Sequence, residues 1–297
     1  MQVFDAGLKR FTGVLAFLTL AHGAELKQET LRAWEVYVQA AKAQMHERRA
    51  REHAFLRTDE IPGRAGLLRS GALVVEPQER PSPMRVRSGL IHHWRGAAFF
   101  SNARMDDVSK VVRDYDNYSE FYRPAVLASR TLERSDTLEK SGTGDRFSVL
   151  LMNKAVLAGT ALEVDTQSTY FPVDLRRLYS VSFTSRIQQI EGYGAATEHK
   201  LLPDQGNGYI WRMYSITRFE ERDGGVYFEV EAMTLSRDIP FTLRWLVEPM
   251  VRRFSKNTLV TSLRQTQKAV GAAVIANRAP ARINGPQIAP ESFVKND

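Results

Sequence analysis

Apolar and polar residues alternate along the middle of the chain, which is the pattern of β-strands with one buried face. Glycine-rich joints such as residues 206–208 and 224–225 separate the alternating segments and are typical of hairpin turns. The pattern predicts strands over residues 90–100, 125–133, 145–153, 155–168, 177–190, 208–220 and 226–236, with a short strand near 72–75. We therefore expect a curved antiparallel sheet of about six or seven strands.

Apolar residues at spacings of three and four predict helices on both sides of this strand region. Residues 25–56 form one such segment, and its apolar stripe consists of Leu31, Trp34, Val38, Ala41 and Met45. Because the stripe is narrow, we expect this helix to lie on a surface of the protein or on a partner. Further helices are predicted over residues 106–122 and 241–272. The last one is apolar on two opposite faces, so it is either buried on both sides or interrupted near residues 255–258.

The last two predicted strands indicate how the sheet is oriented. When Phe219 is placed opposite Val226, one face of this hairpin carries apolar and hydroxyl side chains. The other face carries Arg212, Tyr214, Arg218, Tyr227, Glu229 and Glu231. Since charged and apolar residues separate by face, we expect a sheet with one apolar face and one solvated face.

The N-terminus has the composition of a secretory signal. Lys9 and Arg10 precede an apolar run over residues 11–21, and small residues follow at Ala21 and Gly23. We expect a cleaved signal over residues 1–23 and export to the periplasm or the cell exterior. A buried N-terminal helix and an uncleaved membrane anchor are the alternatives.

The remaining segments divide the chain into regions. Residues 57–88 are rich in proline and glycine, which predicts a linker, and the proline-containing C-terminus predicts a disordered tail. The expected organisation is a signal over residues 1–23, a helix and linker over 24–87, one main domain over 88–272 and a tail over 273–297.

Composition limits the chemistry that this chain can perform. Its 297 residues are 43% hydrophobic and 25% charged, which is enough for a sizeable core. The absence of cysteine excludes disulfides, thiolate nucleophiles and cysteine-ligated metals. The net charge is +7, but the basic residues are spread out, so we expect no nucleic-acid partner. Because no phosphate loop or metal-ligand spacing occurs, we also expect no metal and no cofactor.

Two segments and the order of elements carry a resemblance to a known superfamily. One segment runs from Val111 to Pro124, with Tyr115, Tyr118 and Phe121 at spacings of three, and the other is the strand over residues 224–232. Over residues 88–272 the order is strand, helix, a run of antiparallel strands and a long C-terminal helix. This order resembles the START-like superfamily, which includes lipid-transfer START domains, pollen-allergen-like proteins, polyketide cyclases and coenzyme Q-binding proteins.

The resemblance implies an α+β helix-grip fold, in which the curved sheet wraps round the C-terminal helix, here with an extra N-terminal helix. Members of the superfamily commonly hold sterols, phospholipids, quinones or aromatic polyketides in a cavity between the sheet and that helix. We therefore expect this chain to bind, carry or sense an apolar small molecule or a lipid.

The side chains of the apolar sheet face and of the C-terminal helix are the candidate lining of this cavity. We expect it to include Trp211, Met213, Phe219, Phe228, Val230, Leu243, Met250 and Phe254, with Phe147, Val149 and Phe183 as further candidates. Hydroxyl side chains that suit a polar part of the ligand are Ser215 and Thr217 on one strand and Ser180, Ser182 and Thr184 on another. The alternative is that these residues form a solid core.

Two other functions are open alternatives to a carrier or sensor. A START-like enzyme, such as a cyclase, dehydratase or hydrolase for an aromatic or polyketide-type substrate, needs a titratable group in the cavity. The candidates are His92, His93, Glu163 and Asp165, although we assign no catalytic residue. A protein-interaction module would instead use the stripe on the N-terminal helix. The C-terminal helix also suits an anionic membrane surface through Arg244, Arg252, Arg253, Lys256, Arg264 and Lys268.

Overall fold

A ten-stranded antiparallel sheet forms the centre of the protein. The computed structural model describes residues 26–50, 54–78, 82–135, 142–152, 161–205, 210–238 and 244–278. The strands are β1 (Val74–Pro77), β2 (Met84–Val86), β3 (Gly89–Ser101), β4 (Val126–Glu133), β5 (Thr143–Met152), β6 (Ala161–Pro172), β7 (Arg177–Glu191), β8 (His199–Lys200), β9 (Ile210–Arg222) and β10 (Gly225–Arg237). Their order is β1-β3-β10-β9-β7-β6-β5-β4, and β2 and β8 pair at the sides of β3 and β7.

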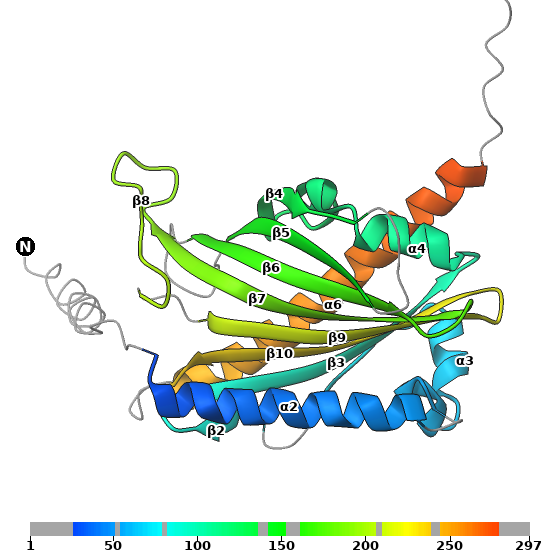
Figure 1. Ribbon diagram of the computed structural model, residues 1–297, viewed down its shortest axis with the longest axis horizontal. Coiled ribbons are helices and arrows are strands. Elements are labelled where there is room, and N and C mark those ends of the chain that lie inside the picture. Colours follow the sequence, from blue (N-terminus) through cyan, green and yellow to red (C-terminus); the bar gives the residue numbers. More distant parts are fainter. Residues whose placement is uncertain are drawn as a thin grey trace, which may run out of the picture.

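Helices lie on both sides of this sheet. They are α2 (Gln28–Ala50), η1 (Arg57–Glu60), α3 (Arg64–Arg69), α4 (Met105–Val112), η2 (Tyr115–Asn117), α5 (Tyr118–Phe121) and α6 (Arg244–Arg278). In Figure 1, α2 crosses in front of the strands near β3 and β10, whereas α6 runs diagonally behind the sheet. The arrangement is the predicted α+β helix-grip fold with an additional N-terminal helix.

Within the described residues the predicted strands are present, and the differences lie in the short elements; residues 153, 155–160 and 208–209 of the predicted strands lie outside the described residues. The region predicted as a linker contains η1, α3, β1 and β2. The single helix predicted over residues 106–122 is divided into α4, η2 and α5. At the division, Tyr115 turns inward and is 1% exposed. The helix is therefore interrupted where the Tyr115 ring is buried.

The C-terminal helix α6 is continuous from Arg244 to Arg278, without the interruption that residues 255–258 suggested, and it ends six residues beyond the predicted residue 272. It approaches the sheet closely at Gly96 of β3. A methyl group at Gly96 would lie 2.9 Å from Leu263 Cδ1 of α6. The missing side chain therefore allows Leu263 to pack directly on the strand, where it is 2% exposed.

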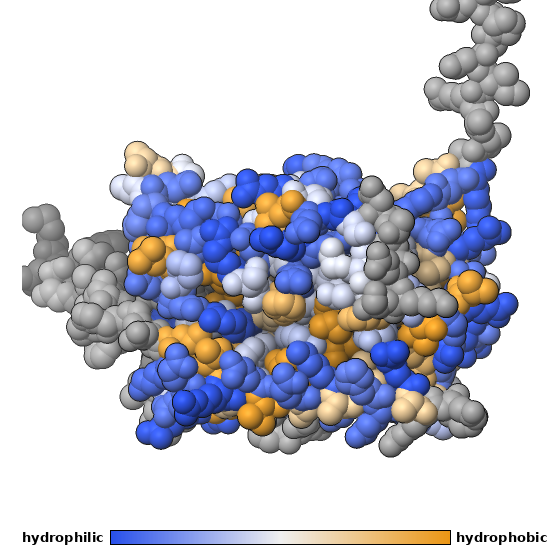
Figure 2. Space-filling view, viewed as in Figure 1, coloured by the Kyte–Doolittle hydropathy of each residue, from blue (hydrophilic) through white to orange (hydrophobic). Residues whose placement is uncertain are grey.

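The apolar stripe of α2 packs on the face of the sheet that is opposite to α6. Trp34, Val38, Ala41 and Met45 are buried in one cluster with side chains of β3, β9 and β10. The first buried position is Thr30, not Leu31, and its hydroxyl donates a hydrogen bond of 2.6 Å to Arg87 O. The stripe therefore lies on a surface of the protein itself, which is the first of the two predicted alternatives, and the chain's own sheet covers the residues that a partner would have needed. The opposite side of α2, which lies at the bottom of the view in Figure 2, is mainly hydrophilic.

The β9–β10 hairpin has a different register from the predicted one. Phe219 lies opposite Phe228, two residues from the predicted partner Val226. Because side chains alternate with a period of two, this shift leaves the same side chains together on each face near the turn. The face expected to be solvated is instead buried beneath α2 and η1. Arg218 is 1% exposed and Glu231 is 3% exposed, so the prediction that this face is solvated is wrong.

The predicted signal peptide over residues 1–23 and residues 279–297 of the predicted tail lie outside the described residues. Residues 273–278, which the tail prediction included, belong to α6. None of the helices in the described part of the chain is long and apolar enough to span a membrane.

Candidate functional site

One face of the sheet is directed at α6, and it is identified by an apolar cluster. Phe219 and Phe228 pack there with Leu263 and Val270 of α6. Because side chains alternate between the faces of a strand, every second residue from these positions shares the α6 face. This face therefore continues through Thr217 and Ser215 on β9 and through Val230 and Ala232 on β10.

The middle of the α6 face contains partly exposed side chains. Seven neighbouring side chains there are only half-buried, although they face a long helix, whereas the aromatic cluster at one end is fully buried. These seven are Thr166, Ser182, Met213, Ser215, Val230, Ala232 and Thr234, which we call the central strip. These seven side chains are therefore only partly covered by the described residues.

Hydroxyl groups follow the central strip across three strands. Ser168 and Ser182 share a hydrogen bond of 2.6 Å between their Oγ atoms, and Thr184 Oγ1 accepts a hydrogen bond of 3.0 Å from Met213 N. The hydroxyls of Ser215 and Thr217, in contrast, form no hydrogen bond with any residue of the described chain. Their hydroxyls are therefore available to a bound molecule or to water.

A tyrosine network closes the strip on the side of β5 and β6. Tyr115 donates a hydrogen bond of 2.9 Å to Asp145 Oδ2, and its ring stacks on Phe147 at 4.1 Å between centroids. Arg113 forms an ion pair with Asp145 at 2.8 Å. Burial, followed by the neighbouring Tyr170, raises the pKa of Tyr115 far above its ordinary value. The phenol therefore stays protonated and acts as a hydrogen-bond donor in a rigid wall.

The structure brings six of the predicted lining residues together on the α6 face. They are Met213, Phe219, Phe228, Val230, Ser215 and Thr217. Phe147 and Val149 belong to the adjoining cluster beneath η2. Leu243 lies outside the described residues, as do the side chains of Met250 and Phe254, whose backbone belongs to α6.

Trp211 and Phe183 lie elsewhere than predicted. Trp211 belongs to the cluster that α2 covers, because an irregularity between Leu235 and Ser236 of β10 shifts the register at this end of β9. Phe183 pairs with Tyr214, which is in the same cluster, and it is 39% exposed. Neither side chain faces α6, so both are removed from the candidate lining.

The four titratable candidates occupy three different environments. His92 is on the α6 face, where Nε2 lies 2.8 Å from Ser236 Oγ, and burial lowers its pKa to about 4. His93 points to the opposite face, with Nδ1 at 2.8 Å from the hydroxyl of Tyr37. Glu163 and Asp165 both form ion pairs with Arg186, which is 38% exposed. Only His92 is therefore directed toward the space beneath α6.

Sequence reasoning missed a buried charge cluster on the α2 face. Arg218 forms an ion pair of 2.6 Å with Glu231 and lies 3.8 Å from Glu229. Glu229 also accepts hydrogen bonds from Arg57 N at 2.9 Å and Thr58 N at 2.6 Å, which attaches η1 to the sheet. Burial alone would raise the pKa of Glu231, but the contact with His93 and the charges of Arg218 and Arg57 lower it well below the ordinary value.

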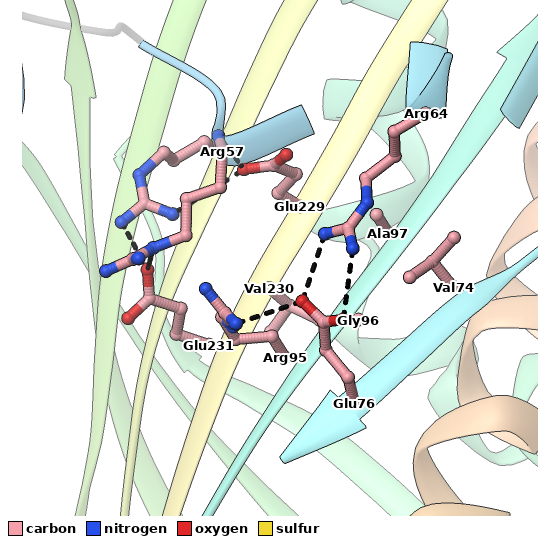
Figure 3. Close-up of a pocket in the computed structure, with 11 residues that line it drawn as sticks. Arg57, Arg64, Val74, Glu76, Arg95, Gly96, Ala97, Glu229, Val230 and Glu231 are labelled. Carbon is pink, nitrogen blue, oxygen red and sulfur yellow. Dashed lines mark hydrogen bonds and ion pairs between the residues drawn. The ribbon is translucent and has the colours of Figure 1, made fainter. Parts of the chain in front are cut away.

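A second group of charges adjoins this cluster, as Figure 3 shows. Arg64 forms two hydrogen bonds of 3.0 Å with Glu76, and Arg95 forms an ion pair of 2.9 Å with the same carboxylate. The only signal in the sequence was the alternation of charges on β9 and β10, which equally suits a solvated face. Segments 57–64 and β1, which cover this face, were read as a linker with one short strand.

Comparisons with known proteins address the fold. No protein-family model matches the chain, and no curated protein matches it. Among solved structures, a STAR-related lipid transfer protein fragment from Xanthomonas axonopodis is 16% identical, with a TM-score of 0.42, and the match covers 66% of this chain and 98% of that one. Human STARD10 is 10% identical, with a TM-score of 0.42, over 67% of this chain and 69% of that one.

An aromatase/cyclase is also similar to this chain. Zhui aromatase/cyclase from Streptomyces sp. R1128 is 13% identical, with a TM-score of 0.33, over 63% of this chain and 93% of that one. At these identities and TM-scores, the likenesses carry no inference about ligand or activity. The strand order and the position of α6 place the chain in the helix-grip fold, which is the fold that the resemblance to START-like proteins predicted.

Proposed function

We propose that this protein binds an uncharged, amphiphilic small molecule or lipid between the central strip and α6, and that it carries or senses this molecule. The central strip carries the proposal: its seven side chains are half-buried although they face α6. A binding site of this type is concave, largely apolar and furnished with a few polar groups. The central strip offers apolar contacts through Met213, Val230 and Ala232 and hydroxyls through Ser215 and Thr234.

The polarity of the strip favours a neutral ligand. None of its seven side chains is charged, and burial keeps the neighbouring His92 neutral at physiological pH by lowering its pKa to about 4. A buried carboxylate or phosphate without a cationic partner would lose its hydration without compensation. Hydroxyl, carbonyl or ether groups, in contrast, can accept hydrogen bonds from Ser215 and Thr217.

Ligand extraction is the direct test of this proposal. The purified full chain is analysed by native mass spectrometry and by organic extraction, before and after incubation with neutral sterols, quinones and diacylglycerols. Ser215→Trp places a large ring in the open space, so this variant is expected to lose at least about tenfold in affinity, which corresponds to roughly 1.4 kcal/mol.

The matched control is Leu175→Trp, since Leu175 is 98% exposed in the turn between β6 and β7. This variant is expected to retain the ligand. The proposal fails if no neutral amphiphile binds to the wild type, or if Ser215→Trp folds and binds as well as the control does.

We propose further that the protein is exported and takes up its ligand at an anionic membrane surface. The order of basic, apolar and small residues at the N-terminus supports export. Lys256, Arg264 and Lys268 are exposed on α6, which supports electrostatic attraction to anionic lipid.

Vesicle flotation tests the membrane proposal. The wild type is expected to float with vesicles that contain phosphatidylglycerol and not with neutral phosphatidylcholine vesicles, and a variant with Lys256, Arg264 and Lys268 changed to glutamine is expected to lose this binding. The control changes three exposed cations near the opposite edge, Arg130, Arg134 and Arg146, to glutamine. Equal loss in both triple variants would show a general charge effect and contradict a specific α6 surface.

The enzymatic alternative has one candidate group left. Of the four titratable residues considered, only His92 faces the space beneath α6, and its hydrogen bond to Ser236 orients the ring. An enzyme that depends on this imidazole would lose turnover in a His92→Gln variant while keeping its ligand, whereas a carrier has no turnover to lose.

A further inference from the structure

We propose that the buried charge cluster beneath η1 and α3 is a binding site for a small monovalent anion such as chloride. The site is a partly enclosed pocket on the sheet face that is opposite to the proposed ligand space. Its volume is about 20 Å³, which suits a single-atom ion or one water molecule. Figure 3 shows the pocket between β3, β10 and the segment that carries Arg57 and Arg64.

Cations outnumber carboxylates around this pocket. Its walls include four arginines, Arg57, Arg64, Arg95 and Arg218, but three glutamates, Glu76, Glu229 and Glu231. Each arginine has a carboxylate within 4.0 Å, but the four arginines and three glutamates together carry a net charge of +1. An anion in the pocket would neutralise that charge, and a buried charge without compensation is costly.

The carboxylates are occupied, whereas the guanidinium groups are not. Glu76 accepts hydrogen bonds from Arg64 on both oxygens, and Glu229 accepts backbone hydrogen bonds on both of its oxygens. In contrast, Nη1 of Arg218 and Nε of Arg95 are buried and have no hydrogen-bond partner. Guanidinium N–H groups without a hydrogen-bond partner, beside carboxylates that already accept hydrogen bonds on both oxygens, favour an anion over a cation.

Arg218 is the strongest of these donors, because it is 1% exposed and lines the pocket. Its Nε contacts the sulfur of Met45 at 3.1 Å and its Nη2 donates to Glu231, whereas Nη1 has no hydrogen-bond partner and lies 3.8 Å from Glu229 Oε2. Buried polar groups of this kind are almost always paired with protein, water or an ion.

The electrostatics of Arg57 agree with unbalanced positive charge. Burial lowers the pKa of Arg57, and after the opposing attraction of Glu231 the charges of Arg48, Arg95 and Arg218 lower it further. Arg57 also lines a second, more open pocket of about 350 Å³ with Gln44, Glu47, Arg48 and Gln78. A small ion can therefore reach the inner pocket past Arg57 from solvent.

Bromide soaking tests the site in the full chain. Crystals grown without halide are soaked in sodium bromide, and anomalous diffraction is expected to show bromide beside Nη1 of Arg218. In solution, the midpoint of thermal unfolding is expected to rise saturably, by about 2–4 °C, when sodium gluconate is replaced by sodium chloride at constant sodium concentration.

Two variants distinguish this site from general salt effects. Arg95→Gln removes one of the four cations, at a partly exposed position, and makes the group of arginines and glutamates neutral, so it is expected to abolish the shift between chloride and gluconate. The control is Arg69→Gln, which removes an exposed ion pair with Asp223 and should keep the shift. Absence of bromide together with equal midpoints in both salts would mean that the pocket holds water only, which overturns the proposal. An equal shift in Arg95→Gln and Arg69→Gln would also overturn it.

Discussion

Neighbouring residues of β9 and β10 belong to two chemically different environments. Thr217 faces α6, while the next residue, Arg218, lies in the charge cluster beneath α2. On β10, Val230 faces α6 between Glu229 and Glu231, which face the other side. Alternation along each strand thus places hydroxyl and apolar groups on one face and compensated charges on the other.

The charge cluster shows what residue patterns can and cannot predict. The alternation of Arg218, Glu229 and Glu231 correctly predicts that these side chains share one face. It does not distinguish a solvated face from a face covered by a helix, because both tolerate charges when each has a partner. Only the three-dimensional position of α2 and η1 shows that the charges are buried.

The environment of His92 predicts a pH-dependent stability. Burial lowers the pKa of His92 from 6.5 to about 4 in the folded protein, while in the unfolded chain it returns to the ordinary value. Between these values the unfolded state binds a proton that the folded state does not. The free energy of unfolding should therefore fall as the pH decreases through this window, by up to about 1.4 kcal/mol per pH unit from this group.

Urea denaturation of the wild type and of His92→Gln measures this effect. The variant should show a smaller decrease over the same window, whereas His46→Gln, at an exposed position of α2, should behave as the wild type does. An imidazole of His92 that titrates near 6.5 by NMR would contradict the prediction.

At the scale of elements, α2 is the part of the structure that most changes the view from sequence. The stripe of apolar residues correctly predicted a helix and its buried side. It did not reveal the surface on which the helix lies, because Trp34, Val38 and Met45 would suit a partner protein equally well. The surface is identified by its contacts with β3, β9 and β10.

Local alternation predicted the strands well for a physical reason: the two faces of a long strand meet different surroundings, as in β3, β9 and β10, where one face belongs to the cluster with α6 and the other to the cluster with α2. The elements that were missed, such as α3 and β2, contain six and three residues, which is too short for a period to emerge. The register irregularity between Leu235 and Ser236 was also invisible, and it moved Trp211 to the face beneath α2.

Truncation of Trp34 tests how strongly α2 is attached to the sheet. Trp34 is 6% exposed, so Trp34→Ala leaves a cavity between α2 and the strands and should lower the free energy of unfolding by about 3–5 kcal/mol. Val36→Ala, at a position of the same helix that is 72% exposed, should change it little. Chemical denaturation of both variants checks the difference, and equal stabilities would mean that the packing of α2 contributes little.

At the scale of the whole molecule, the sheet separates two layers with different tasks. The central strip on the α6 side is only partly buried, while the α2 layer is held by an apolar cluster and by the charges around Arg218. The helix-grip topology followed from the order of predicted elements. The ligand itself did not, because the same apolar residue types line cavities and solid cores.

A single β-sheet separates the α2 layer from the α6 layer. Arg218 and Glu231 belong to the same strands, β9 and β10, as the side chains that face α6. A small displacement of either strand on the α6 side would therefore also displace these charged side chains on the other side. If a ligand binds between the sheet and α6 as proposed, its binding should therefore be detectable on the α2 side of the sheet. Trp34 lies in the cluster on that side, so its indole fluorescence is expected to change when the proposed ligand binds.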